Sequence, residues 1–181
     1  MNRKRRIHMD IAVISYSFTG NNQLLAGSIA KELSAEHIQI SEPKTRTTGT
    51  IALDMIFSRT PRVQPAPETI GGYDLVLFFG PVWMGHVAAP LRAYFKYLKS
   101  HPQRYGFLSI SGGADGTNPK LTGDLHKRAG TEPAVLIDLH IADLLPDHQK
   151  TVRKDTSAYR LNDSDIHKLT HTMMQKLREV I

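Results

Sequence analysis

The residues best suited to chemistry in this chain form a polar loop close to its start. The loop spans residues 15–22, between an apolar run at 11–14 and an amphipathic helical pattern that begins near residue 21. Its polar side chains are Ser15, Ser17, Thr19, Asn21 and Asn22. A strand, a tight turn and a helix N-terminus form an anion site, because the free N–H groups of the first helical turn and the positive end of the helix dipole face the turn. No Lys or Arg lies in the loop, so it predicts a phosphate held mainly by neutral donors, such as that of a mononucleotide.

The same loop also fits a plainer interpretation. It contains neither the G-x-x-x-x-G-K-[ST] pattern of triphosphate loops nor the G-x-G-x-x-G pattern of dinucleotide sites. An ordinary strand-to-helix turn with Thr19 or Asn21 as the N-cap has a similar composition, since these residue types cap helices. The segment alone leaves both interpretations open.

A second loop, at residues 80–87, carries the chain's single tryptophan. Its sequence is Gly80-Pro81-Val82-Trp83-Met84-Gly85-His86-Val87. Glycine lets backbone approach a flat ligand closely, while Trp83 and Met84 offer that ligand a polarisable apolar surface. The alternative is that Trp83 packs in the core with its N–H satisfied. Its position in a Gly/Pro loop at the end of a strand favours contact with a ligand.

A third loop, at residues 111–119, is rich in glycine and small polar residues. It reads Ser111-Gly112-Gly113-Ala114-Asp115-Gly116-Thr117-Asn118-Pro119. Exposed backbone N–H groups in such a loop can hydrogen-bond the polar edge of a heterocycle. A flexible connector is the alternative, since Gly, Asp and Asn are favoured in turns for local reasons.

These loops are positioned by alternating strand and helix patterns, which are typical of an α/β fold with a parallel sheet. The predicted strands cover residues 10–15, 37–40, 73–79, 105–110 and 134–139, and the predicted helices begin near residues 21, 90, 120 and 163. We therefore expect an open doubly wound sheet of five parallel strands, in the order 2-1-3-4-5, with helices on both faces. Ligands in such sheets bind outside the carboxyl ends of the strands, which selects the three loops described above.

Two segments interrupt the alternation. Residues 41–69 contain four prolines, and we expect a short helix around 51–57 followed by an extended passage. Residues 141–161 separate the fifth strand from the last helix. Loops of this length inside a compact domain are usually functional or mobile, and these two could build a pocket for an acceptor.

The composition is that of one soluble globular domain. The chain has 181 residues, a hydrophobic content of 40% and no cysteine, so disulfides and thiolate chemistry are excluded. Residues 1–9 are expected to be a basic tail and residues 10–181 a single domain. No apolar stretch approaches the roughly 20 residues that a membrane span needs, and no secretory signal is apparent. The expected location is the cytoplasm, with no membrane partner.

The charge pattern argues against nucleic acid as a partner. Of the formal net charge of +6, four units come from residues 3–6, which leaves 19 basic and 17 acidic residues elsewhere. A short basic tail on a near-neutral body is typical of a solvated end rather than a nucleic-acid site. No metal site is expected either. His167 and His171 share a helix face, but no carboxylate-rich H-E-x-x-H pattern surrounds them.

Taken together, the loops resemble those of the flavodoxin-like family. Residues 17–22 are similar to its phosphate loop, S-x-T-G-N-T, and residues 80–86 to its G-x-P-V-W-x-G loop after the third strand. The resemblance implies FMN as cofactor. It implies phosphate contacts from Ser15, Ser17, Phe18, Thr19, Gly20, Asn21 and Asn22, and contacts to the ribityl chain and ring from Pro81, Val82, Trp83, Met84 and Gly85. It also implies contacts on the other side of the ring from Ser111, Gly112, Gly113 and Asp115.

Two departures from the family pattern bear on function. Asn22 stands where the family has Thr, and the chain is basic where typical flavodoxins are acidic. The flavin would carry the chemistry, so no catalytic acid or base is required. The resemblance implies an FMN-dependent oxidoreductase that reduces quinones or similar small acceptors from NAD(P)H. The alternatives are a flavodoxin-type electron carrier, with redox proteins as donor and acceptor, and a flavin-free interaction module on the same fold; a homodimer stays open.

Overall fold

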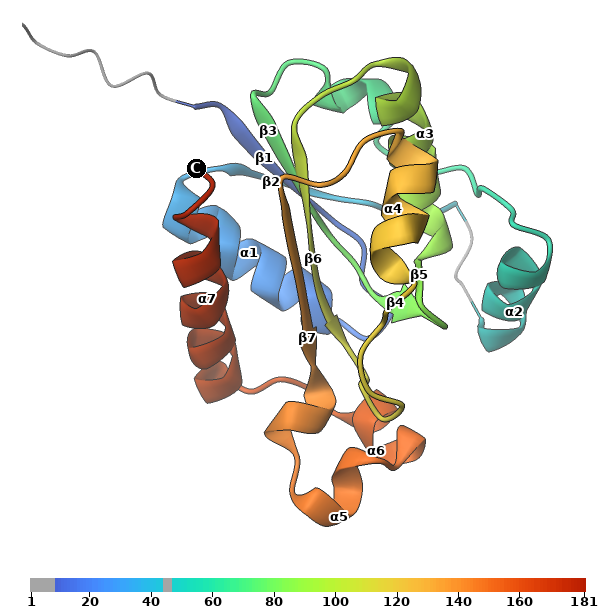
Figure 1. Cartoon of the computed structure of the whole chain (residues 1–181), viewed down its shortest axis with the longest axis vertical. Helices are drawn as coiled ribbons and strands as arrows, with labels where there is room; N and C mark the ends of the chain where they lie inside the picture. The colour runs from blue at the N-terminus through green and yellow to red at the C-terminus, as the bar shows by residue number, and fades with distance from the viewer. Residues whose placement is uncertain (1–8, 44–46) are drawn as a thin grey trace, which may run out of the picture.

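A computed structural model describes residues 9–43 and 47–181 of the chain and shows a five-stranded parallel sheet. Its strands are β1 (Ile11–Ser15), β2 (Glu36–Gln39), β3 (Leu75–Phe79), β6 (Tyr105–Ser111) and β7 (Val135–His140). Their order in the sheet is β2-β1-β3-β6-β7, which in chain order is the predicted 2-1-3-4-5 (Figure 1). The open doubly wound sheet is therefore confirmed. Most of the expected basic tail, residues 1–8, lies outside the described residues.

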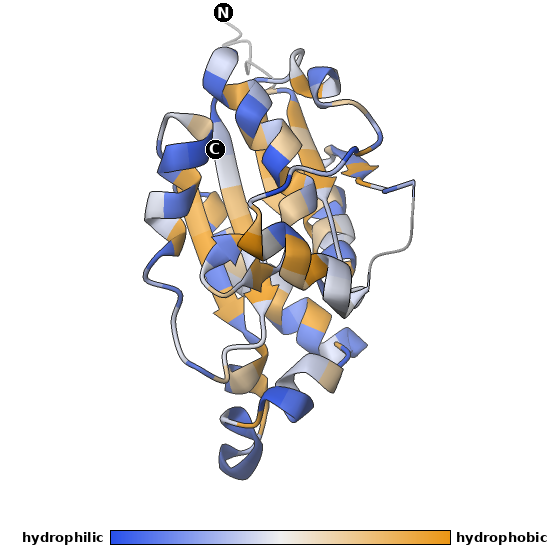
Figure 2. Ribbon diagram, turned by 90° about the vertical axis from the view of Figure 1, so that its right-hand side faces the viewer, coloured by the Kyte–Doolittle hydropathy of each residue, from blue (hydrophilic) through white to orange (hydrophobic). Residues whose placement is uncertain are grey.

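Helices cover both faces of the sheet. Figure 1 shows α1 (Asn21–Leu33) and α7 (Asp163–Leu177) on one face, and α3 (Arg92–Ser100) and α4 (Leu121–Ala129) on the other. The two layers give two apolar cores, one on each face. All five residues of β3 are buried, because a central parallel strand with helices on both sides exposes neither face. Figure 2 shows much of the central sheet in the orange of apolar residues, whereas the helices carry both hydrophilic and hydrophobic residues.

The described part of the first long segment, residues 41–43 and 47–69, lies at the side of the molecule (Figure 1). It contains α2 (Thr48–Ile56), which begins earlier than predicted because Thr47 and Thr50 form a reciprocal capping box. An extended passage returns the chain to the body through a bridge between Ser41 and Gln64 and ends in a 3-10 turn at Pro67–Ile70.

The second long segment, residues 141–161, folds into short helical pieces at the carboxyl end of the sheet (Figure 1). They are a 3-10 turn at Ile141–Leu144, then α5 (Asp147–Lys150) and α6 (Arg153–Ala158). The sequence predicted no structure here, because each piece is too short to show a helical period.

A small hairpin, also absent from the sequence prediction, occupies the loop after β3. Its strands are β4 (Val82–Trp83) and β5 (His86–Val87), with Val82 paired to Val87 and Trp83 to His86. In the part of the chain that the structure describes, no helix is long and apolar enough to cross a membrane.

Candidate functional site

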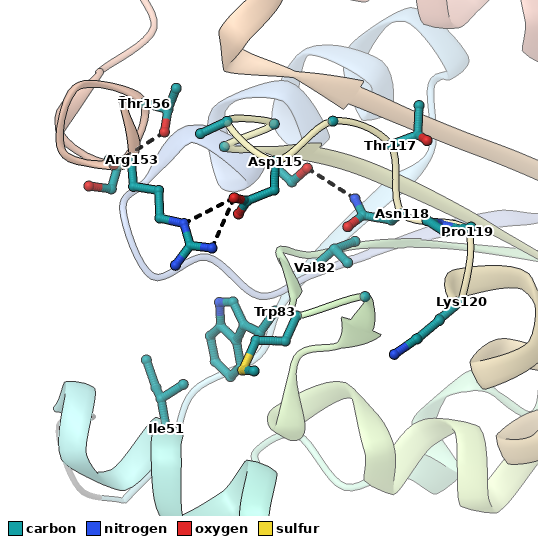
Figure 3. A pocket seen from close by; sticks show the side chains of 18 of the residues that line it. Ile51, Val82, Trp83, Asp115, Thr117, Asn118, Pro119, Lys120, Arg153 and Thr156 are labelled. Carbon is teal, nitrogen blue, oxygen red and sulfur yellow. Dashed lines mark hydrogen bonds and ion pairs between the residues drawn. The ribbon is translucent and has the colours of Figure 1, made fainter. Parts of the chain in front are cut away.

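The second and third predicted loops line one cavity of about 880 Å³ at the carboxyl ends of the strands, and the first loop contributes Phe18 to its wall. Figure 3 shows the hairpin side chains on one side of it and the 111–119 loop with α6 on the other. The lining comprises Phe18, residues 82–85, residues 111–120, Ile51, Ala52 and Ile56 of α2, and Arg153, Thr156 and Ser157 of α6. Both long segments of the chain thus contribute to the wall.

The loop at 15–22 leaves polar groups unsatisfied. Gly20, with a φ of 92°, is the N-cap of α1, and no side chain among residues 9–43 and 47–181 caps the helix. The interpretation that made Thr19 or Asn21 the N-cap is therefore wrong. The hydroxyl oxygen of Ser17 is buried and has no hydrogen-bond partner in the same residues. Such a group costs roughly 1–3 kcal/mol when it stays unpaired, so a loop with this hydroxyl beside free helical N–H groups suits an anion.

Three side chains expected to face the ligand are engaged elsewhere. The Asn22 amide donates to the carbonyl of Ile110 and accepts from its N–H, both at 3.0 Å. The Asn21 amide donates to the carbonyl of Tyr159 at 3.0 Å and accepts from the N–H of Leu161 at 3.2 Å. These bonds engage both side-chain amides within the chain. They hold the loop against the end of β6 and against the segment before α7.

The side chain of Ser15 is also engaged within the chain. Its hydroxyl is 2.8 Å from Nε2 of His37 on β2, and burial lowers the pKa of that imidazole and so favours its neutral form. The pair ties the end of β1 to β2. Of the polar side chains in the loop, Ser17 alone has a buried oxygen without a partner among residues 9–43 and 47–181.

Trp83 lies at the wall of the cavity and is half-buried. Its ring meets Tyr16 edge to face, with centroids 6.2 Å apart and planes at 88°. Figure 3 shows the indole facing the open space between α2 and the 111–119 loop. Met84 follows at the hairpin turn, 84% exposed and with a φ of 52°. The alternative of a Trp83 sealed in the core therefore does not hold, although one edge of the ring packs on the body.

The hairpin is fastened to α4 through a buried carboxylate that the sequence did not reveal. Asp124 receives hydrogen bonds from the ring of His86, the N–H of Val87 and the guanidinium of Arg128. Burial acts to raise the pKa of Asp124, but these three donors outweigh burial and hold it below the ordinary value. Asp124 therefore stays ionised at neutral pH.

The loop at 111–119 is anchored rather than loose. Asn118 donates to Asp138 at 2.6 Å, and His140 lies 3.3 Å from the same carboxylate oxygen, which raises the pKa of His140. Gly113 has a φ of 75°, and a Cβ there would lie 2.4 Å from Cβ of His140, so only glycine fits. The loop therefore packs closely on the ends of β6 and β7, and the alternative interpretation as a flexible connector does not hold.

An exposed ion pair joins the third loop to α6. The guanidinium of Arg153 lies 2.9 Å from the carboxylate of Asp115 across one side of the cavity (Figure 3). A Cβ on Gly112 would come within 3.2 Å of the Thr156 hydroxyl, so α6 packs directly on the glycine run. Pro81 and Gly80 lie at the base of the hairpin, where a Cβ on Gly80 would meet Leu91 at 2.4 Å.

Metal ligands do not gather in the described part of the chain. No group of three or more His, Cys, Asp or Glu side chains among residues 9–43 and 47–181 could hold a metal ion. His167 and His171 lie exposed on α7, as a solvated helix face requires.

Solved structures that share this architecture include flavin proteins. A flavoprotein from Lactobacillus acidophilus NCFM, solved in complex with FMN, is 23% identical over 72% of this chain and 93% of that protein, with a TM-score of 0.60. The apo form of the flavoprotein from that organism gives a TM-score of 0.54 at 23% identity, over 73% of this chain and 91% of that one. A flavodoxin from the domain Archaea is 12% identical over 95% of this chain and 99% of its own, with a TM-score of 0.51.

No protein-family model matches the chain, and no curated protein matches it. At identities this low, the structural likeness establishes the fold. The chain has a flavodoxin-like fold, and the resemblance predicted from its loops is confirmed at that level.

Proposed function

We propose that this protein binds FMN in the cavity and acts as an oxidoreductase that transfers electrons from NAD(P)H to quinones or similar small acceptors. One observation supports the cofactor most directly. The buried, unpartnered hydroxyl of Ser17 precedes a helix N-terminus that no side chain caps, within residues 9–43 and 47–181. A phosphate is a ligand that satisfies both features at once.

The residues fit FMN along its length. The hydroxyls of Ser17 and Thr19 and the first backbone N–H groups of α1 would hold the phosphate. Trp83 and Met84 would supply an apolar wall for the ring. The N–H groups around Gly112 and Gly113 would meet the polar edge of the ring. A volume of about 880 Å³ lies in the upper part of the range for small-molecule sites, so it leaves room for a second molecule.

FMN held by these residues would supply the redox chemistry that links a nicotinamide donor to a two-electron acceptor. The chain's own task is to bind, to orient and to exclude water. Asn21 and Asn22 contribute by bracing the phosphate loop through the contacts described above. Apolar side chains of the hairpin and α2 would form part of the wall beside the ring.

The two long segments, which contribute α2 and α6 to the wall of the cavity, favour an enzyme over a pure carrier. Ile51, Ala52 and Ile56 of α2 and Thr156 and Ser157 of α6 line the same cavity as Trp83. A carrier needs an exposed ring edge for contact with another protein, whereas walls from two additional segments build a pocket for a small acceptor. Exposed apolar groups at the rim, Met84 at 84% and Ile56 at 73%, keep the carrier as the second candidate, because a redox protein could dock on them.

The deciding experiment starts from the purified protein reconstituted with FMN. Under anaerobic conditions, NADH or NADPH is added and the flavin absorbance is followed, and then a quinone is added. Bleaching by a nicotinamide and recovery with the quinone are expected for the enzyme. Bleaching by dithionite alone, with no response to either nicotinamide, would favour the carrier. Failure to bind FMN at all would leave the interaction module.

A further inference from the structure

One buried carboxylate stands apart from the groups assigned to FMN. Asp124 lies in the first turn of α4, with its side chain only 5% exposed. It is not among the residues that line the cavity. Carboxylates are seldom buried unless they are paired and hydrogen-bonded, so the partners of this group indicate what it holds in place.

Two of its three partners are the two residues of β5. Oδ1 of Asp124 is 2.9 Å from Nδ1 of His86, and Oδ2 accepts the backbone N–H of Val87 at 3.1 Å. The third partner, Arg128, lies one turn further along α4 and donates from Nε to Oδ2 at 2.9 Å. One carboxylate therefore holds the whole of β5 against α4.

β5 in turn fixes the side chains at the wall of the cavity. The register of the hairpin places Trp83 opposite His86, and Met84 follows in the turn. A hairpin with two residues in each strand is not stable alone, and a left-handed φ of 52° is unfavourable for Met84. The geometry of the hairpin thus depends on contacts with the rest of the protein.

The same helix supports the turn at a second point. A Cβ on Gly85 would lie 3.4 Å from Cβ of Lys120, which is the N-cap of α4, so the turn packs against the start of this helix. Lys120 gives this contact through its aliphatic stem. Asp124, one turn later, makes the hydrogen bonds to β5. Because hydrogen bonds are directional, they fix the orientation of β5 relative to α4.

We propose that Asp124 is a positioning residue of the site: by holding β5 on α4, it sets where Trp83 and Met84 stand in the cavity wall. Its effect on FMN rests on the proposed function. Its effect on the hairpin does not, because the contacts are present in the chain itself.

The test compares three variants of the full chain. Asp124→Asn keeps the shape but loses the carboxylate, His86→Ala removes one of the two links to the hairpin, and Arg128→Gln removes the link that stays within α4. FMN affinity is expected to fall about tenfold in Asp124→Asn, less in His86→Ala, and less than about twofold in Arg128→Gln. The emission of Trp83, the only tryptophan, and its quenching by iodide are measured on the apo proteins.

The apo measurement separates this proposal from the proposed function. Asp124→Asn and His86→Ala should shift Trp83 emission and increase its quenching, while Arg128→Gln should not. If wild-type protein binds no FMN, the proposed function fails, and the emission pattern still decides the role of Asp124. Unchanged emission and affinity in both Asp124→Asn and His86→Ala would overturn the proposal. Equal effects of His86→Ala and Arg128→Gln would also overturn it, since they would mean a purely structural network.

Discussion

α1 and α7 lie side by side on one face of the sheet, yet they begin in opposite ways. α7 starts with a complete capping box, in which Asn162 accepts the N–H of Asp165 at 3.0 Å and Asp165 accepts the N–H of Asn162 at 3.1 Å. α1 starts at Gly20, without a capping side chain in the described part of the chain. A helix that satisfies its own first turn contributes stability only, whereas one that leaves donors open can bind a ligand. Within one layer of the molecule, the start of α7 therefore belongs to the scaffold and the start of α1 to the candidate site.

The largest expected effect concerns the phosphate itself. FMN should bind apo protein at least about 100-fold more tightly than riboflavin, since at least two hydrogen bonds to a charged group, each worth about 1.5–3 kcal/mol, are lost without the phosphate. Calorimetric titration of both flavins measures this ratio. Equal affinities would mean that the start of α1 binds no phosphate and that its difference from α7 has no functional meaning.

A second test asks whether every polar residue in the loop belongs to the site. Asn22→Ala should lower the free energy of unfolding of the apo protein by about 2–4 kcal/mol, because it removes two buried hydrogen bonds and leaves the N–H and carbonyl of Ile110 unpaired. Urea unfolding provides the measurement. The control is Gln23→Ala, at an exposed neighbour, which should change stability by no more than about 0.5 kcal/mol. A stable Asn22→Ala protein would return that amide to the list of candidate ligand contacts.

Ser17→Ala should show the opposite pattern. The hydroxyl has no partner within residues 9–43 and 47–181, so apo stability should stay the same or rise slightly. FMN affinity should fall about tenfold, which corresponds to one hydrogen bond to a charged group. Both quantities are measured on the same preparation. A fall of stability beyond about 1 kcal/mol with affinity retained would make Ser17 part of the scaffold.

The smallest effect is expected at the start of α7. Asn162→Ala removes the cap and should lower the free energy of unfolding by about 1 kcal/mol. FMN affinity should remain within a factor of about two, because the start of α7 is satisfied by its own capping box and offers no open donor to a phosphate. A clear loss of affinity would show that the two helix starts are coupled.

The frame of the molecule could be predicted from sequence because its signals are long and repeated. β3 is five apolar residues in a row, and α3 buries Tyr94, Phe95 and Leu98 at a helical spacing. Alternation of such strands and helices leaves few possible topologies. The rule that ligands bind at the carboxyl ends of parallel strands then selected the second and third loops, which line the cavity, and the first loop, which contributes Phe18 to it.

The details that escaped prediction depend on contacts distant in the sequence. Asn22 resembles a ligand donor until Ile110, 88 residues away, takes both ends of its amide. Asp124 looks like an ordinary surface acid of an amphipathic helix, and its burial arises only once β5 packs on it. The hairpin itself has strands of two residues and a turn at Met84 and Gly85, which lacks the Asn-Gly or Asp-Gly signal of a tight hairpin.

The bond between Asn22 and Ile110 has a consequence for any mutational library made from this chain. A selection for folded protein alone would retain asparagine at position 22 and let position 17 drift, since only the first of these side chains is used by the scaffold. A selection for the cofactor would constrain both. At each position, the enrichment of the native residue under cofactor selection can be divided by its enrichment under folding selection. This ratio would distinguish residues required for ligand binding from residues required for folding, even for positions 17 and 22, which lie five residues apart in one loop.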